Sequence, residues 1–298
     1  MLQWLIVLSS PSTLPRSANL VHVRAPRTGH RDPALREPLA RLGALGSAAG
    51  WRAATLALLV TPGSRREHAA WARLVRDVPD APQIFEDISL LTPALRQPWF
   101  EHFARALAPG PVALRHDVIG AARQVMVADG LVSALDQLRW VALRHLLAGS
   151  AVSAPAAAPT ELEALGLDQA RCVCLFSGFL SRLVPAPELT LDLNGGESVS
   201  ELWYVAVTAP WQDRLALPPR EGHDVDAALR ALRVLQSLPW LQRPVLVRSW
   251  YDAARALTEG PALHVDAADA LRLCCVLLDS PVPPELGHQY IEPEPAQH

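Results

Sequence analysis

The sequence contains no lysine, so arginine supplies all 27 of its basic side chains. The phosphate-binding loop of nucleotide hydrolases is therefore excluded, because its motif requires a lysine next to the phosphates. The chain also lacks His-Glu-x-x-His, the motif that gives a metallopeptidase two zinc ligands and a general base. It has no Gly-x-Ser-x-Gly nucleophile elbow. These absences predict a protein that is not an enzyme.

Cysteine is scarce, and its spacing fits neither a zinc site nor a redox motif. The four cysteines are Cys172, Cys174, Cys274 and Cys275, with no Cys-x-x-Cys among them. Residues one or two apart on a helix do not face each other, so neither pair is expected to form a disulfide. We expect buried free thiols, a reducing cytoplasmic location and no cofactor.

Long hydrophobic runs are also missing. The apolar start at residues 1–8 is far shorter than the roughly 20 residues that a membrane-spanning helix needs. It has no basic start and no cleavage site typical of a signal peptide. The sequence predicts a soluble chain whose membrane contact is at most peripheral.

Basic charge is concentrated near the N-terminus but forms no continuous run. The first 80 residues contain 11 arginines and five carboxylates, whereas the formal net charge of the whole chain is −3. The arginines alternate with apolar residues, which favours a solvated helical face over a patch for an anionic membrane or an acidic partner. We expect no nucleic-acid partner.

The chain does have abundant apolar residues, at 50% of the total, and most recur at helical spacing. The fold class predicted is therefore all-α. Residues 1–50, rich in proline, serine, glycine and arginine, are expected to form a poorly ordered extension. Two helical bundles are predicted at 51–149 and 161–290, joined by an Ala/Pro linker at 150–160 and followed by a tail at 291–298.

Several helix ends carry recognisable capping residues. Ser64 with Glu67, and Ser133 with Asp136, have the three-residue spacing of a capping box. Pro98 is predicted to lie in the first turn of a helix, where its missing N–H is tolerated.

The two halves resemble each other. Residues 114–130 and 245–260 each form a predicted amphipathic helix that ends at an acidic residue followed by glycine. A second apolar helix with the pattern Asp-x-Leu-Arg follows in both halves, at 136–139 and at 269–272. The sequence therefore predicts that a helix–acidic turn–helix unit is used twice.

This pattern resembles a known family. Residues 126–136, Met-Val-Ala-Asp-Gly-Leu-Val-Ser-Ala-Leu-Asp, are similar to the helix–Ala-Asp-Gly–helix signature of TerB-like domains. Residues 268–284 resemble the C-terminus of HtpX-type bacterial membrane zinc peptidases, most specifically at 277–284, Leu-Leu-Asp-Ser-Pro-Val-Pro-Pro. The resemblance covers roughly residues 50–290. It implies a regulatory, non-catalytic relative of that cytosolic region, because the His-Glu-x-x-His motif is missing.

Asp129 and Asp136 flank the first acidic turn and are the candidate metal ligands. Two carboxylates and nearby carbonyl oxygens can hold a divalent cation, and the resemblance implies a link to metal for some TerB-like proteins. A calcium loop normally supplies more carboxylates than this turn offers. The favoured interpretation is therefore structural, with a left-handed glycine and with Asp136 as a helix cap.

Three of the nine tryptophans are candidate interaction residues. Most tryptophans fall on apolar stripes and are expected in the core, but Trp99, Trp211 and Trp240 lie within one residue of a proline. Core packing is favoured for these three as well, with an exposed interface as the alternative.

The leading functional hypothesis is a non-catalytic helical interaction or regulatory module. Its protein partner is unknown, and the resemblance suggests a membrane-associated peptidase or stress-response machinery. One alternative is a sensor of divalent metal acting through the acidic turns. Another is a C-terminal fragment of a membrane zinc peptidase.

Overall fold

The computed structural model describes residues 33–148, 161–186, 198–215 and 225–294. Every element in those ranges is a helix and no strand occurs there, which confirms the all-α class. The α-helices are α1 Pro33–Gly43, α2 Ala48–Leu58, α3 Arg65–Leu74, α4 Ala81–Ser89, α5 Pro93–Leu107, α6 Val112–Met126, α7 Ala134–Ala148, α8 Leu167–Leu180, α9 Val199–Thr208, α10 Val225–Gln236, α11 Gln242–Ala256, α12 Val265–Leu277 and α13 Pro284–Gly287. Short 3₁₀ helices span Leu162–Ala164 and Ala209–Trp211.

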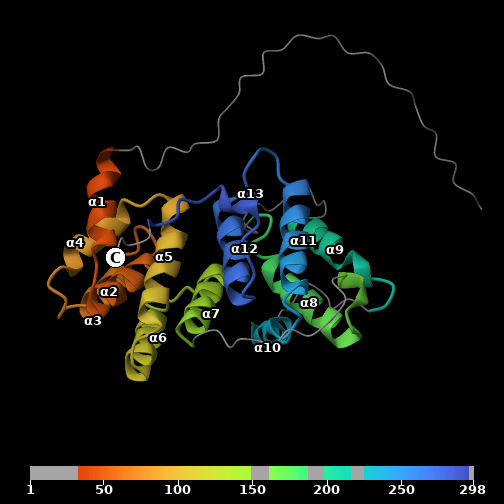
Figure 1. Cartoon of the computed structure of the whole chain (residues 1–298), viewed down its shortest axis with the longest axis horizontal. Helices are drawn as coiled ribbons and strands as arrows, with labels where there is room; N and C mark the ends of the chain where they lie inside the picture. Colours follow the sequence, from red (N-terminus) through yellow and green to blue (C-terminus); the bar gives the residue numbers. More distant parts are fainter. Residues whose placement is uncertain (1–32, 149–160, 187–197, 216–224, 295–298) are drawn as a thin grey trace, which may run out of the picture.

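The helices form one continuous body with α7 and α12 at its centre. Figure 1 shows α1–α6 towards one end, α8–α11 towards the other, and α7 and α12 between them. Helix α12 packs against both α7 and α11, and every residue from Ala267 to Leu277 is buried. A helix that is buried on all sides requires neighbours on all sides.

The two bundles predicted at 51–149 and 161–290 are therefore not separate. A single hydrophobic core continues from the first half into the second. Sequence periodicity shows which face of a helix is buried but not which helix covers it, and here each half covers the other. The predicted linker at 150–160 lies outside the described residues.

The N-terminal prediction is wrong for residues 33–50. Helix α1 buries Leu35 and Leu42, and the guanidinium of Arg41 lies 2.6 Å from a carboxylate oxygen of Asp87 on α4. Leu35 and Leu42 are seven residues apart, two helical turns, so they lie on one face of α1. The prolines and arginines around them obscured this short apolar stripe. Residues 1–32 lie outside the described range.

The predicted position of Pro98, in the first turn of a helix, is also wrong. Its actual position leaves a backbone carbonyl free to bind the C-terminal segment. Helix α5 begins at Pro93, so Pro98 lies inside it and cannot donate to the carbonyl of Ala94. The backbone N–H of Ile291 donates to that carbonyl instead, at 3.0 Å. Residues 291–294 of the predicted tail are thereby attached to α5, whereas 295–298 lie outside the described residues.

The predicted helix caps are largely confirmed. Ser64 Oγ accepts a hydrogen bond from the backbone N–H of Glu67, as expected. The carboxylate of Glu67, however, accepts from the N–H of Thr61 at 2.5 Å instead of returning to Ser64. Ser133 and Asp136 form the full reciprocal capping box, with bonds of 3.1 and 3.0 Å.

Both acidic turns end in a left-handed glycine, with φ of +86° at Gly130 and +93° at Gly260. The Asp-x-Leu-Arg motifs that follow make different contacts. Arg139 pairs with Asp269 of the other motif, but Arg272 does not pair with the first motif. The turns are alike locally, and the wider repeat remains a prediction.

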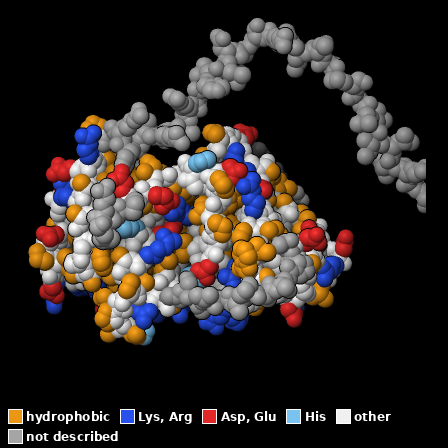
Figure 2. Space-filling model, viewed as in Figure 1, with side chains coloured by type: hydrophobic (Ala, Val, Ile, Leu, Met, Phe, Trp, Pro, Cys, Tyr) orange, Lys and Arg blue, Asp and Glu red, His pale blue; other side chains and the backbone are white. Residues whose placement is uncertain are grey.

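The surface mixes charge of both signs. On the face shown in Figure 2, arginine and acidic side chains are interspersed with hydrophobic ones over most of the helices. None of the helices in the described ranges combines the length and apolar character needed to cross a bilayer.

Candidate functional site

A cleft of about 1230 Å³ lies where the two halves meet, beside the N-terminal ends of α7 and α12. Both acidic turns contribute to its wall, together with residues of α3, α5 and α9. Its lining contains six carboxylates: Glu67, Asp129, Asp136, Glu259, Asp266 and Asp269. It contains three arginines: Arg96, Arg139 and Arg182. Clefts of this size and position are common binding sites.

The first acidic turn places Asp129 on the rim of this cleft. One carboxylate oxygen of Asp129 accepts from the backbone N–H of Leu131 at 2.9 Å, which fixes the turn around Gly130. The carboxylate of Asp136 accepts from both the N–H and the hydroxyl of Ser133. Each carboxylate is therefore engaged in local hydrogen bonds.

Glu67 brings a third carboxylate to the same wall. Its side chain is buried and accepts from the N–H of Thr61. Burial raises the pKa of Glu67 above its ordinary value, and the charges of Asp129 and Asp136 raise it further. This part of the cleft therefore has a negative electrostatic potential.

The second acidic turn lies on the opposite half of the molecule. Glu259 is exposed, and the guanidinium of Arg255 donates to the carbonyl of Gly260 at 2.8 Å. His264 caps α12, since its Nδ1 accepts from the backbone N–H of Asp266. The carboxylates of the two halves thus meet around one cleft.

An ion pair between the halves is part of the cleft lining. Arg139 of α7 donates to Asp269 of α12 at 2.9 Å, and the hydroxyl of Tyr290 donates to the other oxygen of Asp269 at 2.9 Å. Burial raises the pKa of Asp269 above its ordinary value, against the lowering effect of Arg139 and Tyr290.

Arg96 is committed to the protein framework. Its guanidinium donates to the carbonyls of Leu58, Val60 and Ile88, close to the C-terminal ends of α2 and α4. Burial lowers the pKa of Arg96 to about 10, with a further lowering from Arg139. The N–H groups of Arg96 and Arg139 are already used within the protein, so a ligand in the cleft would meet mainly carboxylates.

The metal site predicted at Asp129 and Asp136 stays a prediction. Across the described parts of the chain, no three His, Cys, Asp or Glu side chains are grouped so that they could hold a metal ion. The hydrogen bonds of the two carboxylates instead fit the predicted turn and cap.

Two of the three candidate interaction tryptophans are not on the surface. Trp99 packs against Phe103 within α5, and Trp211 is fully buried, with its Nε1 donating to the carbonyl of Leu162. The neighbouring prolines begin or continue helical turns here and do not expose the rings. Trp240 is 58% exposed, and Leu241 beside it is exposed as well.

Ser177, Cys174, Cys274 and Cys275 are held in the core, whereas Cys172, expected to be buried, is half-buried. Ser177 Oγ accepts from the indole N–H of Trp250 at 3.0 Å, and both residues are buried. All four cysteines are free thiols. Burial raises the pKa of Cys174 to about 11 and that of Cys275 to about 12, which keeps both in the unreactive thiol form.

Glu67, Arg139 and Asp269 were not predicted as site residues, although each belongs to a motif that is visible in the sequence. Glu67 belonged to a predicted capping box, and Arg139 and Asp269 belonged to the two Asp-x-Leu-Arg patterns. The occurrence of those patterns in both halves was the signal that could have placed them together.

Comparison with protein-family models, curated proteins and solved structures gives no match to this chain. The resemblance to TerB-like domains and to the HtpX-type C-terminal region therefore stays a prediction from sequence motifs, chiefly those at 126–136 and 268–284.

Proposed function

We propose that this protein is a non-catalytic interaction module that binds a basic segment of a partner protein in the cleft between its two halves. The observation that carries the proposal is the gathering of six carboxylates around a cleft of about 1230 Å³. A segment with arginine or lysine side chains complements that charge.

The interactions of the cleft arginines support a cationic ligand. Six carboxylates against three arginines leave the lining with a net negative charge, and the N–H groups of Arg139 and Arg96 are already used by Asp269 and by backbone carbonyls. Asp129 and Glu259 both line the cleft, one from each half. A cationic segment across the cleft would contact both.

Apolar side chains on the rim supply a second kind of contact. Leu131 is 75% exposed directly after the first acidic turn, and Val265 is exposed at the start of α12. Exposed apolar residues beside complementary charge are typical of protein interfaces. The buried position of Ser177 and the raised pKa values of Cys174 and Cys275 favour binding over nucleophilic catalysis.

The proposal is tested with fluorescein-labelled oligoarginine and oligoglutamate peptides, with binding measured by fluorescence anisotropy. We expect the oligoarginine peptide to bind and the oligoglutamate peptide not to bind. The double variant Asp129→Arg/Glu259→Arg should weaken oligoarginine binding by more than about tenfold, because two attractive charges become repulsive. The affinity of the wild type should fall as salt increases.

The matched control is Asp77→Arg, which reverses the charge of a highly exposed carboxylate outside the cleft. Asp77→Arg should bind oligoarginine almost as tightly as the wild type does, apart from a small loss caused by its higher net charge. Equal losses in the control and the cleft variant would show that the peptide responds to overall charge, and would overturn the proposal.

The motif resemblance suggests which kind of partner would supply the basic segment. A membrane-associated peptidase or its regulators, in the cytoplasm, is the class that the motif resemblance suggests. Capture of the tagged protein from its native cells in mild detergent, compared with the Asp129→Arg/Glu259→Arg variant, tests this. A peptidase that is lost from the variant supports the association, and one recovered equally with both contradicts it.

A further inference from the structure

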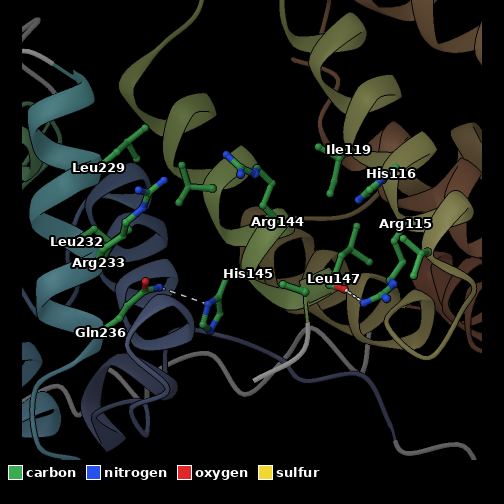
Figure 3. Close-up of a pocket in the computed structure, with 13 residues that line it drawn as sticks. Arg115, His116, Ile119, Arg144, His145, Leu147, Leu229, Leu232, Arg233 and Gln236 are labelled. Atoms are coloured by element: carbon green, nitrogen blue, oxygen red, sulfur yellow. Dashed lines mark hydrogen bonds between the residues drawn. The ribbon is translucent and has the colours of Figure 1, made fainter. Parts of the chain in front are cut away.

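A second pocket, of about 390 Å³, lies between the two halves at a different place. Helix α7 lies in the middle of it, with α6 on one side and α10 on the other (Figure 3). No residue lines both this pocket and the acidic cleft. Its ligand is therefore a separate question from the partner of the cleft.

The charge of this pocket is opposite to that of the cleft. Five basic side chains line it: Arg115, His116, Arg144, His145 and Arg233. No carboxylate is among the described residues that line it. Arg144 and Arg233 lie on the same side of the pocket without a lining counter-ion (Figure 3), so they repel each other and a bound anion would relieve that repulsion.

Two of the arginines have uncommitted N–H groups. Arg144 lies over the ring of Trp140, with its guanidinium carbon 4.7 Å from the ring centroid, and this stacking leaves the edge of the guanidinium free. Arg233 has no hydrogen bond or ion pair to any described residue. Figure 3 shows Arg233 and Leu229 extending from α10 towards α7.

The other basic groups are positioned by the protein. Arg115 Nη1 donates to the carbonyl of Leu147 at 2.6 Å, which leaves its buried Nε without a protein partner. The amide of Gln236 donates to Nδ1 of His145, so Nε2 carries the proton and donates to Asp279 at 3.0 Å. Arg115 and His145 are therefore held by the protein, and the free N–H groups of the pocket are those of Arg144 and Arg233.

The remaining lining is apolar. Val112, Ile119, Val141, Leu147, Leu229 and Leu232 contribute it. A pocket of this volume accommodates a small organic molecule. Arginines beside an apolar lining fit a ligand that has an apolar body and a strongly anionic group. Arginines acting together favour a dianion over a single negative charge.

We propose that the pocket between α6, α7 and α10 binds a phosphate monoester that carries an apolar group. The phosphate contacts the guanidinium groups of Arg144 and Arg233. The apolar group lies on Ile119 and Leu229. The ligand is either a free organic phosphate or the headgroup of a phosphate-monoester lipid, which share this chemistry.

The probe for the free ligand is 1-naphthyl phosphate, with binding measured by calorimetry. 1-Naphthol lacks the charge and inorganic phosphate lacks the apolar group, so both should bind at least about tenfold more weakly. The probe for the lipid is flotation with phosphatidylcholine vesicles, with and without phosphatidic acid. Binding in either arm supports the proposal and identifies the source of the phosphate.

The variants are Arg144→Gln and Arg233→Gln, both at exposed positions whose loss should not disturb folding. Each should weaken binding of the successful probe by about tenfold, since each removes a charge-assisted contact. Arg123→Gln is the control, because Arg123 is exposed on α6 and does not line the pocket. It should change affinity by less than about twofold.

The proposal is overturned if neither probe binds, if inorganic phosphate binds as well as the ester, or if Arg123→Gln weakens binding as much as the pocket variants do. Circular dichroism of each variant confirms that a loss of binding is not a loss of fold.

Discussion

The guanidinium of Arg272 lies 2.6 Å from the carboxylate of Glu101, and both side chains are almost completely buried, at 4% and 2% exposure. This ion pair joins α12 to α5 across 171 positions in the sequence. A second carboxylate, that of the largely exposed Glu292, also lies 2.6 Å from Arg272. The ring of Tyr290 packs against the guanidinium as well.

Removing one partner of the buried pair should destabilise the protein strongly. We expect Arg272→Met to lower the free energy of unfolding by about 3 kcal/mol, because the buried Glu101 would keep only the partly exposed Arg105 as a cationic partner. Glu292→Gln should cost no more than about 1 kcal/mol, because that carboxylate is exposed to solvent. Urea denaturation followed by circular dichroism measures both values.

The double variant Glu101→Leu/Arg272→Met serves as the control. It removes both charges together, so it should recover a large part of the stability lost in Arg272→Met. A double variant less stable than the single one would show that the buried charges themselves stabilise the junction.

The two turn glycines should be sensitive to substitution. Gly130→Ala and Gly260→Ala should each destabilise the protein by about 1–2 kcal/mol, since φ near +90° is unfavourable for a residue with a Cβ atom. Gly120→Ala is the matched control within α6. A Cβ would meet nothing within 4 Å at any of the three positions.

Gly120→Ala should raise stability by about 0.5–1 kcal/mol, because alanine favours a helix. Thermal unfolding of the three variants separates backbone conformation from steric contact. Equal effects at Gly120 and Gly130 would contradict the role assigned to the left-handed turn.

The exposed and buried tryptophans should respond differently to truncation. Trp211→Ala should cost about 3–5 kcal/mol, because it removes a fully buried ring and leaves the carbonyl of Leu162 without its donor. Trp240→Ala should stay within about 0.5 kcal/mol of the wild type. Intrinsic fluorescence during urea denaturation measures both, and a large cost at Trp240 would show that its ring is structurally required.

Glu67 and Glu285 should give pH dependences of opposite sign. The raised pKa of Glu67 means that the folded protein holds this proton more tightly than the unfolded chain does. Its contribution to stability is therefore present at low pH and is lost as pH rises through its folded pKa. Relative to the wild type, Glu67→Gln should gain stability as pH rises from about 4 to about 7.

Glu285 has a lowered pKa, because its own backbone N–H and the guanidinium of Arg248 donate hydrogen bonds to it. Its contribution is present at higher pH and is lost as pH falls through its folded pKa. Glu285→Gln should therefore lose stability relative to the wild type as pH rises from about 3 to about 5. Denaturation at several pH values tests the pair, and slopes of the same sign would contradict the assignment.

Local features of this fold were predictable from the sequence, because they depend on residues close together in the chain. The Ser133–Asp136 capping box and the left-handed glycine at Gly130 were both expected and both are present. The helix cap at Ser64 was also expected, although the carboxylate of Glu67 was not expected to bond to Thr61.

Relationships between distant segments were not predictable. Trp211 donates a hydrogen bond to Leu162, 49 residues away, in its buried position. Asp269 is paired with Arg139 of α7, which comes from the other half of the chain. The cleft exists because α7 and α12 pack together, so its residues could be recognised singly but not as a site. The basic pocket has the same origin, since Arg144 and Arg233 line it together only because the fold brings α7 and α10 to one pocket.

The place of α12 in the chain has a consequence for how the protein is made. Its buried surface faces α7 from the first half and α11 from the second, and α12 follows both of them in the chain. While the ribosome is still synthesising the second half, α5 and α6 can pack on α7, but the part of α7 that faces α12 has nothing to cover it. We expect the nascent chain to depend on chaperones until α12 has emerged, and the first half expressed alone to aggregate.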